Sequence, residues 1–225
     1  MSTPSSRTRA PRGTLTRARI VDATLQLIDG GGIGAVSMPK LAKHLGVGIM
    51  SLYTHVDSKD DLLDAIAQQV LASLPAPSGD DWQARLACHF RDLRAVLVKH
   101  PGLGTVLAAK NVAVPVVFDM LEQRLADLTA SGVEDLDAAH LYYDLLVYTL
   151  GFVAWELPRT RAMTRREYAK RWRSAVDQLD EARHPTVHRL IDALTTVASD
   201  AQFEGGLGRI IGSVSSNDAR MARDA

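Results

Sequence analysis

The chain has 225 residues, 46% of them hydrophobic, which is too apolar for an intrinsically disordered protein and long enough for a small domain beside a larger one. It has no apolar run of about 18 residues, no apolar segment typical of a secretory signal, and a single cysteine, Cys88, which excludes an internal disulfide. We therefore expect a cytoplasmic protein without membrane contacts. The net charge is zero, but residues 1–59 hold eight Lys and Arg against three Asp, and this +5 is typical of a part that binds a polyanion.

The first 14 residues predict a disordered basic arm, because Arg7, Arg9 and Arg12 lie among Ser, Thr, Ala and Pro. Such an arm either enters a DNA minor groove or displaces counterions from DNA, or it serves only to keep the chain in solution. The sequence leaves these interpretations open.

Three helices and a connecting helix are predicted next. Helical spacing of apolar residues begins at Thr16 and stops at glycines 30–32. Ser37 is expected to cap a second helix that ends at Gly46, and Ser58 to cap a long connecting helix. A short glycine turn between the second helix and a short third one has helix-turn-helix dimensions. The apolar positions expected to hold these helices together are Leu41, Ala42, Leu45, Val47 and Leu52.

The short third helix presents large side chains outward. We expect a partner to cover Ile49, Met50, Ser51, Tyr53, Thr54 and His55, rather than the protein core. The alternative is that Tyr53 and His55 pack under a neighbouring loop, since helix-turn-helix shapes also occur in proteins that bind no DNA.

A linker of Pro, Ala, Ser and Gly at 75–79 predicts the boundary between domains at 15–74 and 80–214, followed by a flexible tail at 215–225. Within the second domain, residues 135–158 are apolar on more than one helical stripe, and 203–214 combine helical spacing with four glycines. A helix that is apolar on two sides needs two partners, so we expect a homodimer. The predicted interface is Leu136, Tyr143, Leu150, Phe203, Leu207, Ile210 and Ile211. The polar stretch 158–164 is predicted to be either a mobile lid or a surface loop.

No catalytic or metal motif is convincing. His184 and His188 have the spacing of a helical metal pair, but no catalytic glutamate follows and no third ligand is evident. Cys88 and His89 are adjacent on a helix, so their side chains diverge. Nucleophile-elbow, Walker and dinucleotide motifs are missing. We expect no metal, no cofactor and no enzymatic activity, with an all-helical enzyme as the alternative.

The segment "SMPKLAKHLGVGIMSLYTHVDSKDDLLDAIA" resembles the DNA-binding motif of TetR-family transcriptional regulators. The shared elements are Leu45-Gly46-Val47, Ser51, Leu52-Tyr53, His55-Val56, Lys59 and Leu62-Leu63. Residues 81–103, 145–156 and 203–214 are similar to the C-terminal domain of the tetracycline-repressor branch. The resemblance implies an all-α fold with an N-terminal three-helix helix-turn-helix domain joined to a larger helical ligand-binding and dimerisation domain.

The resemblance also implies roles in DNA binding. Tyr53, His55 and Lys59 would contact phosphates or the groove edge, and Ser51 would allow close approach. Specificity would fall on Ile49, Met50 and Thr54. Some family members have a base-reading arginine where this chain has Pro39, which leaves Ser37 or Lys40 a phosphate contact at most. The implied DNA-binding set is Ser37, Lys40, Gly48, Ile49, Met50, Ser51, Tyr53, Thr54, His55 and Lys59.

A dimer of this kind would bind an inverted repeat through two recognition helices, and a small molecule would release it. We expect a repressor, with an activator of the same architecture as the alternative. Val147 stands where tetracycline repressors have a magnesium-binding histidine, so neither tetracycline nor magnesium is implied. Each candidate for the ligand site can equally belong to ordinary core or surface: His89, Phe90, Leu103, Thr105, Asn111, Phe118, Tyr143, Val147 and Trp155.

Overall fold

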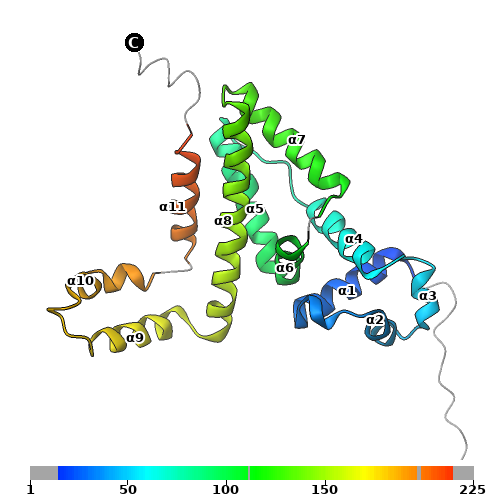
Figure 1. Cartoon of the computed structure of the whole chain (residues 1–225), viewed down its shortest axis with the longest axis horizontal. Coiled ribbons are helices and arrows are strands. Elements are labelled where there is room, and N and C mark those ends of the chain that lie inside the picture. The colour runs from blue at the N-terminus through cyan, green and yellow to red at the C-terminus, as the bar shows by residue number, and fades with distance from the viewer. Residues whose placement is uncertain (1–14, 111, 197–198, 215–225) are drawn as a thin grey trace, which may run out of the picture. The chain divides into compact units, whose positions relative to one another are not determined.

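A computed structural model describes residues 15–110, 112–196 and 199–214. Within this part of the chain every regular element is a helix, which confirms the predicted all-α class (Figure 1). The predicted arm, the predicted tail and Asn111 lie outside the described residues. The elements are α1 (Arg17–Gly31), η1 (Ile33–Ala35), α2 (Met38–Leu45), α3 (Ile49–Tyr53), α4 (Lys59–Leu71), α5 (Trp82–Lys99), α6 (Pro101–Ala109), α7 (Pro115–Ala130), α8 (Asp135–Ala162), α9 (Arg165–Val176), α10 (Pro185–Leu194) and α11 (Asp200–Ile211).

The first helices begin at the polar residues that the sequence favours. The hydroxyl oxygens of Thr16, Ser37 and Ser58 accept backbone N–H bonds from the first turns of α1, α2 and α4, at 3.2, 3.4 and 3.0 Å. At the end of α2, Gly46 has φ of 70°, a left-handed conformation that side chains with a Cβ disfavour. Gly46 thereby turns the chain sharply toward α3.

The chain divides into two compact units. Unit 1 comprises the residues up to Leu74 together with Lys99–Leu121, and unit 2 comprises Pro75–Val98 together with the residues from Glu122 onward. The chain passes from unit 1 to unit 2 after Leu74, which is at the predicted linker. Residues 99–121, which lie within the predicted C-terminal domain, pack with the N-terminal helices.

Unit 1 is held together by an apolar cluster in which α1 to α4 meet. Ile20, Leu41, Leu52 and Leu62 are completely buried there, while Leu45 and Val47 pack partly buried against them. Leu52 is therefore the residue that fastens α3 to the other helices.

Helix α6 joins unit 1 through an unusually close approach to α1. A Cβ on Gly102 would lie 2.1 Å from a side-chain carbon of Ile28, so only glycine fits there. Asp29 at the end of α1 accepts the backbone N–H of Gly102 at 2.8 Å and contacts the His100 ring nitrogen at 3.2 Å. Asp29 thus caps α6 from a different helix.

In unit 2, α8 and α11 run side by side (Figure 1). The Tyr148 hydroxyl donates to the carbonyl of Phe203 at 3.1 Å, and the two rings stack 5.5 Å apart. Gly206 makes room for that tyrosine, because a Cβ there would lie 2.0 Å from its hydroxyl oxygen.

This packing involves three residues of the predicted dimer interface. The side chains of Phe203, Leu207 and Ile211 are 0%, 1% and 6% exposed, because they face the interior of their own unit. The apolar stripe on α11 thus packs within its own unit, and its part in a dimer stays a prediction.

The stretch 158–164 is not a loop. Helix α8 continues through Pro158 to Ala162, and α9 begins two residues after Met163. The hydroxyl of Thr164 and the carboxylate of Glu167 form a capping box that starts α9. The proline removes one backbone donor without ending the helix. None of the helices in the described residues has the length and apolar character to cross a bilayer.

Candidate nucleic-acid interface and ligand site

Helix α3 exposes an apolar and aromatic face that the rest of unit 1 does not cover. Met50 is 72% exposed, Tyr53 45% and Ile49 37%, whereas Leu52 on the opposite side is completely buried. Large apolar side chains beside a buried anchor are typical of a surface that a partner covers. The structure therefore places the specificity candidates outward on one short helix.

The remaining polar candidates around α3 surround this face. Ser51 and Thr54 are exposed, and the Thr54 hydroxyl donates to the Ser51 carbonyl at 2.8 Å. His55 is half-buried, and Gly48 lies at the N-cap without a side-chain hydrogen bond.

Two lysines and one serine flank α3. The ammonium of Lys59 donates to the carbonyl of Ile33 at 3.0 Å and is partly buried, while Lys40 is exposed. Because an ammonium carries three donor protons, this bond leaves two for a phosphate. Ser37 uses its hydroxyl oxygen to cap α2. These residues can therefore supply cations and donors at the edges of the exposed face.

The sequence reasoning missed a pair of charged residues near α3. Arg17 donates to the carbonyl of His55 at 2.9 Å and forms an ion pair with Asp61. No local pattern connects two residues so distant in the chain, so only the tertiary structure reveals the pair.

The interior of unit 2 contains a histidine with one ring nitrogen that no described residue hydrogen-bonds. His89 on α5 is 4% exposed, and its Nε2 atom has no partner among the described residues. Burial, followed by the positive charge of Arg124, lowers its pKa to about 4, so the imidazole is neutral near pH 7. A buried polar atom without a partner costs free energy and is the feature that a ligand can satisfy.

Aromatic rings surround this histidine. Its ring centroid lies 5.0 Å from that of Phe90 and 6.1 Å from that of Tyr142, and burial raises the pKa of Tyr142 to about 12. Tyr143 meets Tyr142 edge to face at 6.2 Å. Tyr142 and Arg124 were not among the sequence candidates, because adjacent tyrosines on a helix do not reveal which of them faces the interior.

The other described ligand candidates lie in unit 1 or on the surface of unit 2. Leu103, Thr105 and Phe118 belong to unit 1, where Leu103 is completely buried and Phe118 is 58% exposed. Val147 and Trp155 are exposed on α8 in unit 2. Within the described residues of unit 2, the structure brings together His89, Phe90 and, at the edge, Tyr143.

Helix α8 has an exposed apolar stripe opposite its buried face. Leu136, Tyr143 and Val147 are 62%, 56% and 67% exposed and recur at helical spacing, and the small residue Ala154 continues the row. Of the predicted interface residues, Leu136 and Tyr143 lie on this stripe, while Leu150 and Ile210 are half-buried.

We expected neither a metal site at His184 and His188 nor a catalytic pair at Cys88 and His89. The ring nitrogens of His184 and His188 contact the carbonyls of Asp180 and Leu179 at 3.1 and 3.2 Å. The Cys88 thiol donates to an Asp92 carboxylate oxygen at 3.7 Å. Within the described residues, no three His, Cys, Asp or Glu side chains gather in a way that suits a metal ion.

Two sequence-family models match the chain. The family described as bacterial regulatory proteins, tetR family, matches residues 20–66, and the tetracyclin repressor-like C-terminal domain matches residues 74–216.

Curated relatives and a solved structure agree with these matches. The HTH-type transcriptional repressor DrrR1 of Streptomyces coeruleorubidus is 31% identical, over 90% of this chain and 78% of that protein. Tetracycline repressor protein class D of Escherichia coli is 30% identical, over 88% of each. The crystal structure of the TetR family protein ActR of Streptomyces coelicolor in complex with actinorhodin has a TM-score of 0.78 at 28% identity, covering 89% of this chain and 95% of that one.

Proposed function

Because this chain belongs to the TetR family of transcriptional regulators, we propose that it is a repressor, not an enzyme, which binds an inverted-repeat operator as a homodimer and is released by a small molecule. The observation that supports this most is the exposed face of α3 around the buried Leu52. Repression is favoured over activation because relatives that match over most of the chain are named repressors. The site of action would be the cytoplasm, where bacterial DNA lies.

The proposed DNA contacts divide into two groups. Ile49, Met50 and Thr54 would read base edges in the major groove, where apolar groups suit thymine methyls. Tyr53 and Lys59 would contact phosphates and fix the register. The edge contacts from Ser37, Lys40, Ser51 and His55 would add affinity, and Gly48 would let the backbone approach closely.

The proposed dimer uses the exposed stripe of α8. Leu136, Tyr143 and Val147 provide apolar area that a second copy would bury, with Ile210 of α11 at its edge. Two-fold symmetry would place the two α3 helices at about 34 to 36 Å, the separation of successive major grooves.

The proposed ligand would enter the aromatic cluster of unit 2. A planar aromatic molecule with one polar group would stack on Phe90 and Tyr142 and satisfy the free Nε2 of His89. Actinorhodin, the ligand of the ActR complex, is a suitable first probe. No metal or cofactor is part of this proposal.

The test is selection of bound sequences from a random duplex pool, followed by affinity measurements at several salt concentrations. We expect a shared inverted repeat and a steep loss of affinity with salt, because phosphate contacts release counterions. Weak binding without a shared sequence would contradict the proposal. Titrating actinorhodin into the operator complex then tests release.

A further inference from the structure

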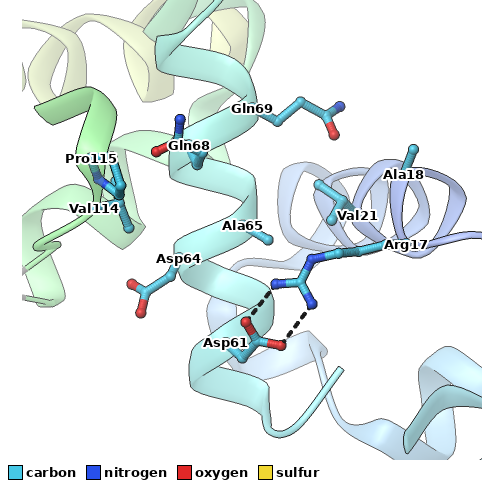
Figure 2. Close-up of a pocket in the computed structure, with 10 residues that line it drawn as sticks. All are labelled: Arg17, Ala18, Val21, Asp61, Asp64, Ala65, Gln68, Gln69, Val114 and Pro115. Carbon is cyan, nitrogen blue, oxygen red and sulfur yellow. Dashed lines mark hydrogen bonds and ion pairs between the residues drawn. The ribbon is translucent and has the colours of Figure 1, made fainter. Parts of the chain in front are cut away.

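One ion pair links α1 to α4 beside the recognition helix α3 (Figure 2). Arg17, the first residue of α1, and Asp61, in the first turn of α4, meet with two parallel contacts. Nη2 lies 2.5 Å from Oδ1, and Nη1 lies 3.1 Å from Oδ2. This two-pronged geometry fixes direction as well as distance.

Each partner also holds the connection between α3 and α4. Nη1 of Arg17 donates to the carbonyl oxygen of His55 at 2.9 Å, and the backbone N–H of Asp57 donates to Oδ2 of Asp61 at 3.1 Å. The residues directly after α3 are thus held at two points. Leu52, the fourth of the five residues of α3, and Val56 are buried in the apolar cluster, so the pair adds a polar anchor to the connection that follows the helix.

Helix α3 depends on such an anchor. It has five residues, too few to be stable alone, and its N-cap supplies no side-chain hydrogen bond. Packing next to the pair is incomplete, because a groove of about 460 Å³ lies there between α1 and α4 (Figure 2). Its other lining residues include Ala18, Val21, Ala65, Gln68, Val114 and Pro115. The pair therefore holds the connection after α3 beside the buried Val56, at a place where α1 and α4 do not pack fully against each other.

The charge of Asp61 argues that the pair positions α3 rather than binds DNA. A carboxylate next to a DNA-facing helix repels phosphates, so on its own it would weaken binding. The hydrogen bonds from Arg17 lower the pKa of Asp61 below its ordinary value, so the carboxylate stays ionised. The side chains are 49% and 27% exposed, so solvent screening keeps their contribution to stability small.

We propose that Arg17 and Asp61 are positioning residues for operator binding, because their pair and its bonds to His55 and Asp57 orient α3 against the major groove. This inference rests on the proposed function, since it requires an operator bound through α3.

The main test is the operator affinity of the full-length Asp61→Asn variant, with Asp60→Asn as its matched control. Both changes remove one negative charge from the first turn of α4, but the Asp60 carboxylate lies 3.9 Å from Lys110 and takes no part in the Arg17 pair. We expect Asp61→Asn to bind about tenfold more weakly despite the lost repulsion. The control should bind as the wild type does or more tightly. Equal or tighter binding by Asp61→Asn overturns the proposal.

A second measurement separates positioning from a direct phosphate contact by Arg17. Arg17→Lys keeps the charge but loses the two-pronged geometry, so we expect a loss similar to that of Asp61→Asn. The double variant should bind no more weakly than either single one, because both changes break the same pair. Additive losses, wild-type binding by Arg17→Lys, or losses that follow a lowered unfolding midpoint overturn the proposal. A wild-type chain that selects no shared sequence instead contradicts the proposed function.

Discussion

Tyr53 lies at the surface with nearly half of its side chain in solvent, so its contribution to DNA binding can be measured without disturbing the fold. We expect Tyr53→Ala to weaken binding to the selected operator and to unrelated DNA by similar factors, because a phosphate contact carries no sequence information. The free energy of unfolding should change by less than about 0.5 kcal/mol. Met50→Ala is the contrasting variant, since it should alter the preferred sequence. A loss confined to the operator would make Tyr53 a base-reading residue.

His89 should make the stability of the protein depend on pH. Its pKa of about 4 lies below the ordinary 6.5, so the folded state disfavours the protonated ring. The free energy of unfolding therefore carries no penalty from His89 above pH 6.5. It decreases as the pH falls toward 4, by up to about 3 kcal/mol, because the unfolded chain binds the proton more tightly. We expect His89→Phe to flatten this dependence in denaturant unfolding at pH 7, 6 and 5. The exposed His140→Gln is the control, and identical pH profiles for wild type and His89→Phe would contradict the assignment.

Single residues also show what a sequence reveals about a site. Ile49, Met50 and Tyr53 were expected to face outward, and they do, because a five-residue helix with one buried leucine has only one way to pack. The Arg17–Asp61 pair was missed because its partners meet only in the tertiary structure.

Among the helices, α8 and α11 approach each other so closely that one glycine limits their spacing. A methyl group at Gly206 would overlap the Tyr148 hydroxyl, and the overlap forces the helices apart. We expect Gly206→Ala to lower the free energy of unfolding by about 1 to 3 kcal/mol. Adding Tyr148→Phe, which removes the nearest atom, should recover part of the loss. Urea unfolding of the single and double variants measures both effects, and a fully stable Gly206→Ala chain would argue against this spacing.

The start of a helix is easier to predict than its end or its neighbours. Ser37 and Ser58 cap their helices as expected, because capping depends on residues within one turn. The stretch 158–164 was expected to be a lid or a loop because it is polar, yet α8 continues past Pro158, since one lost hydrogen bond does not outweigh the rest of a long helix. The spacing of Leu207 indicated an apolar face of the helix, and this side chain is buried within its own unit.

The proposed dimer is a property of the whole molecule, and a substitution on the exposed face of α8 tests it. Val147 is 67% exposed, so Val147→Glu should leave each protomer folded while placing a charge in the proposed interface. We expect monomers in sedimentation at micromolar concentration and weak binding to single half-sites. Ala108→Glu, on the exposed side of α6, should remain dimeric. Leu207→Arg is unsuitable for this purpose because that side chain is buried and its replacement would unfold unit 2. Dimeric Val147→Glu would place the interface elsewhere.

The way in which unit 1 is assembled limits how related regulators can exchange domains. Its helices come from two separate stretches of chain, and Gly102 and Asp29 join those stretches at a contact too close for any residue but glycine. A chimaera that grafts only residues 15–74 onto a relative's sensor domain would bring a foreign α6 against Ile28. A relative with a larger residue at position 102 would reject the graft. Recombination between paralogues at the linker would therefore give a folded protein only where the α6 segment and the N-terminal helices come from the same parent. The two stretches would then evolve together.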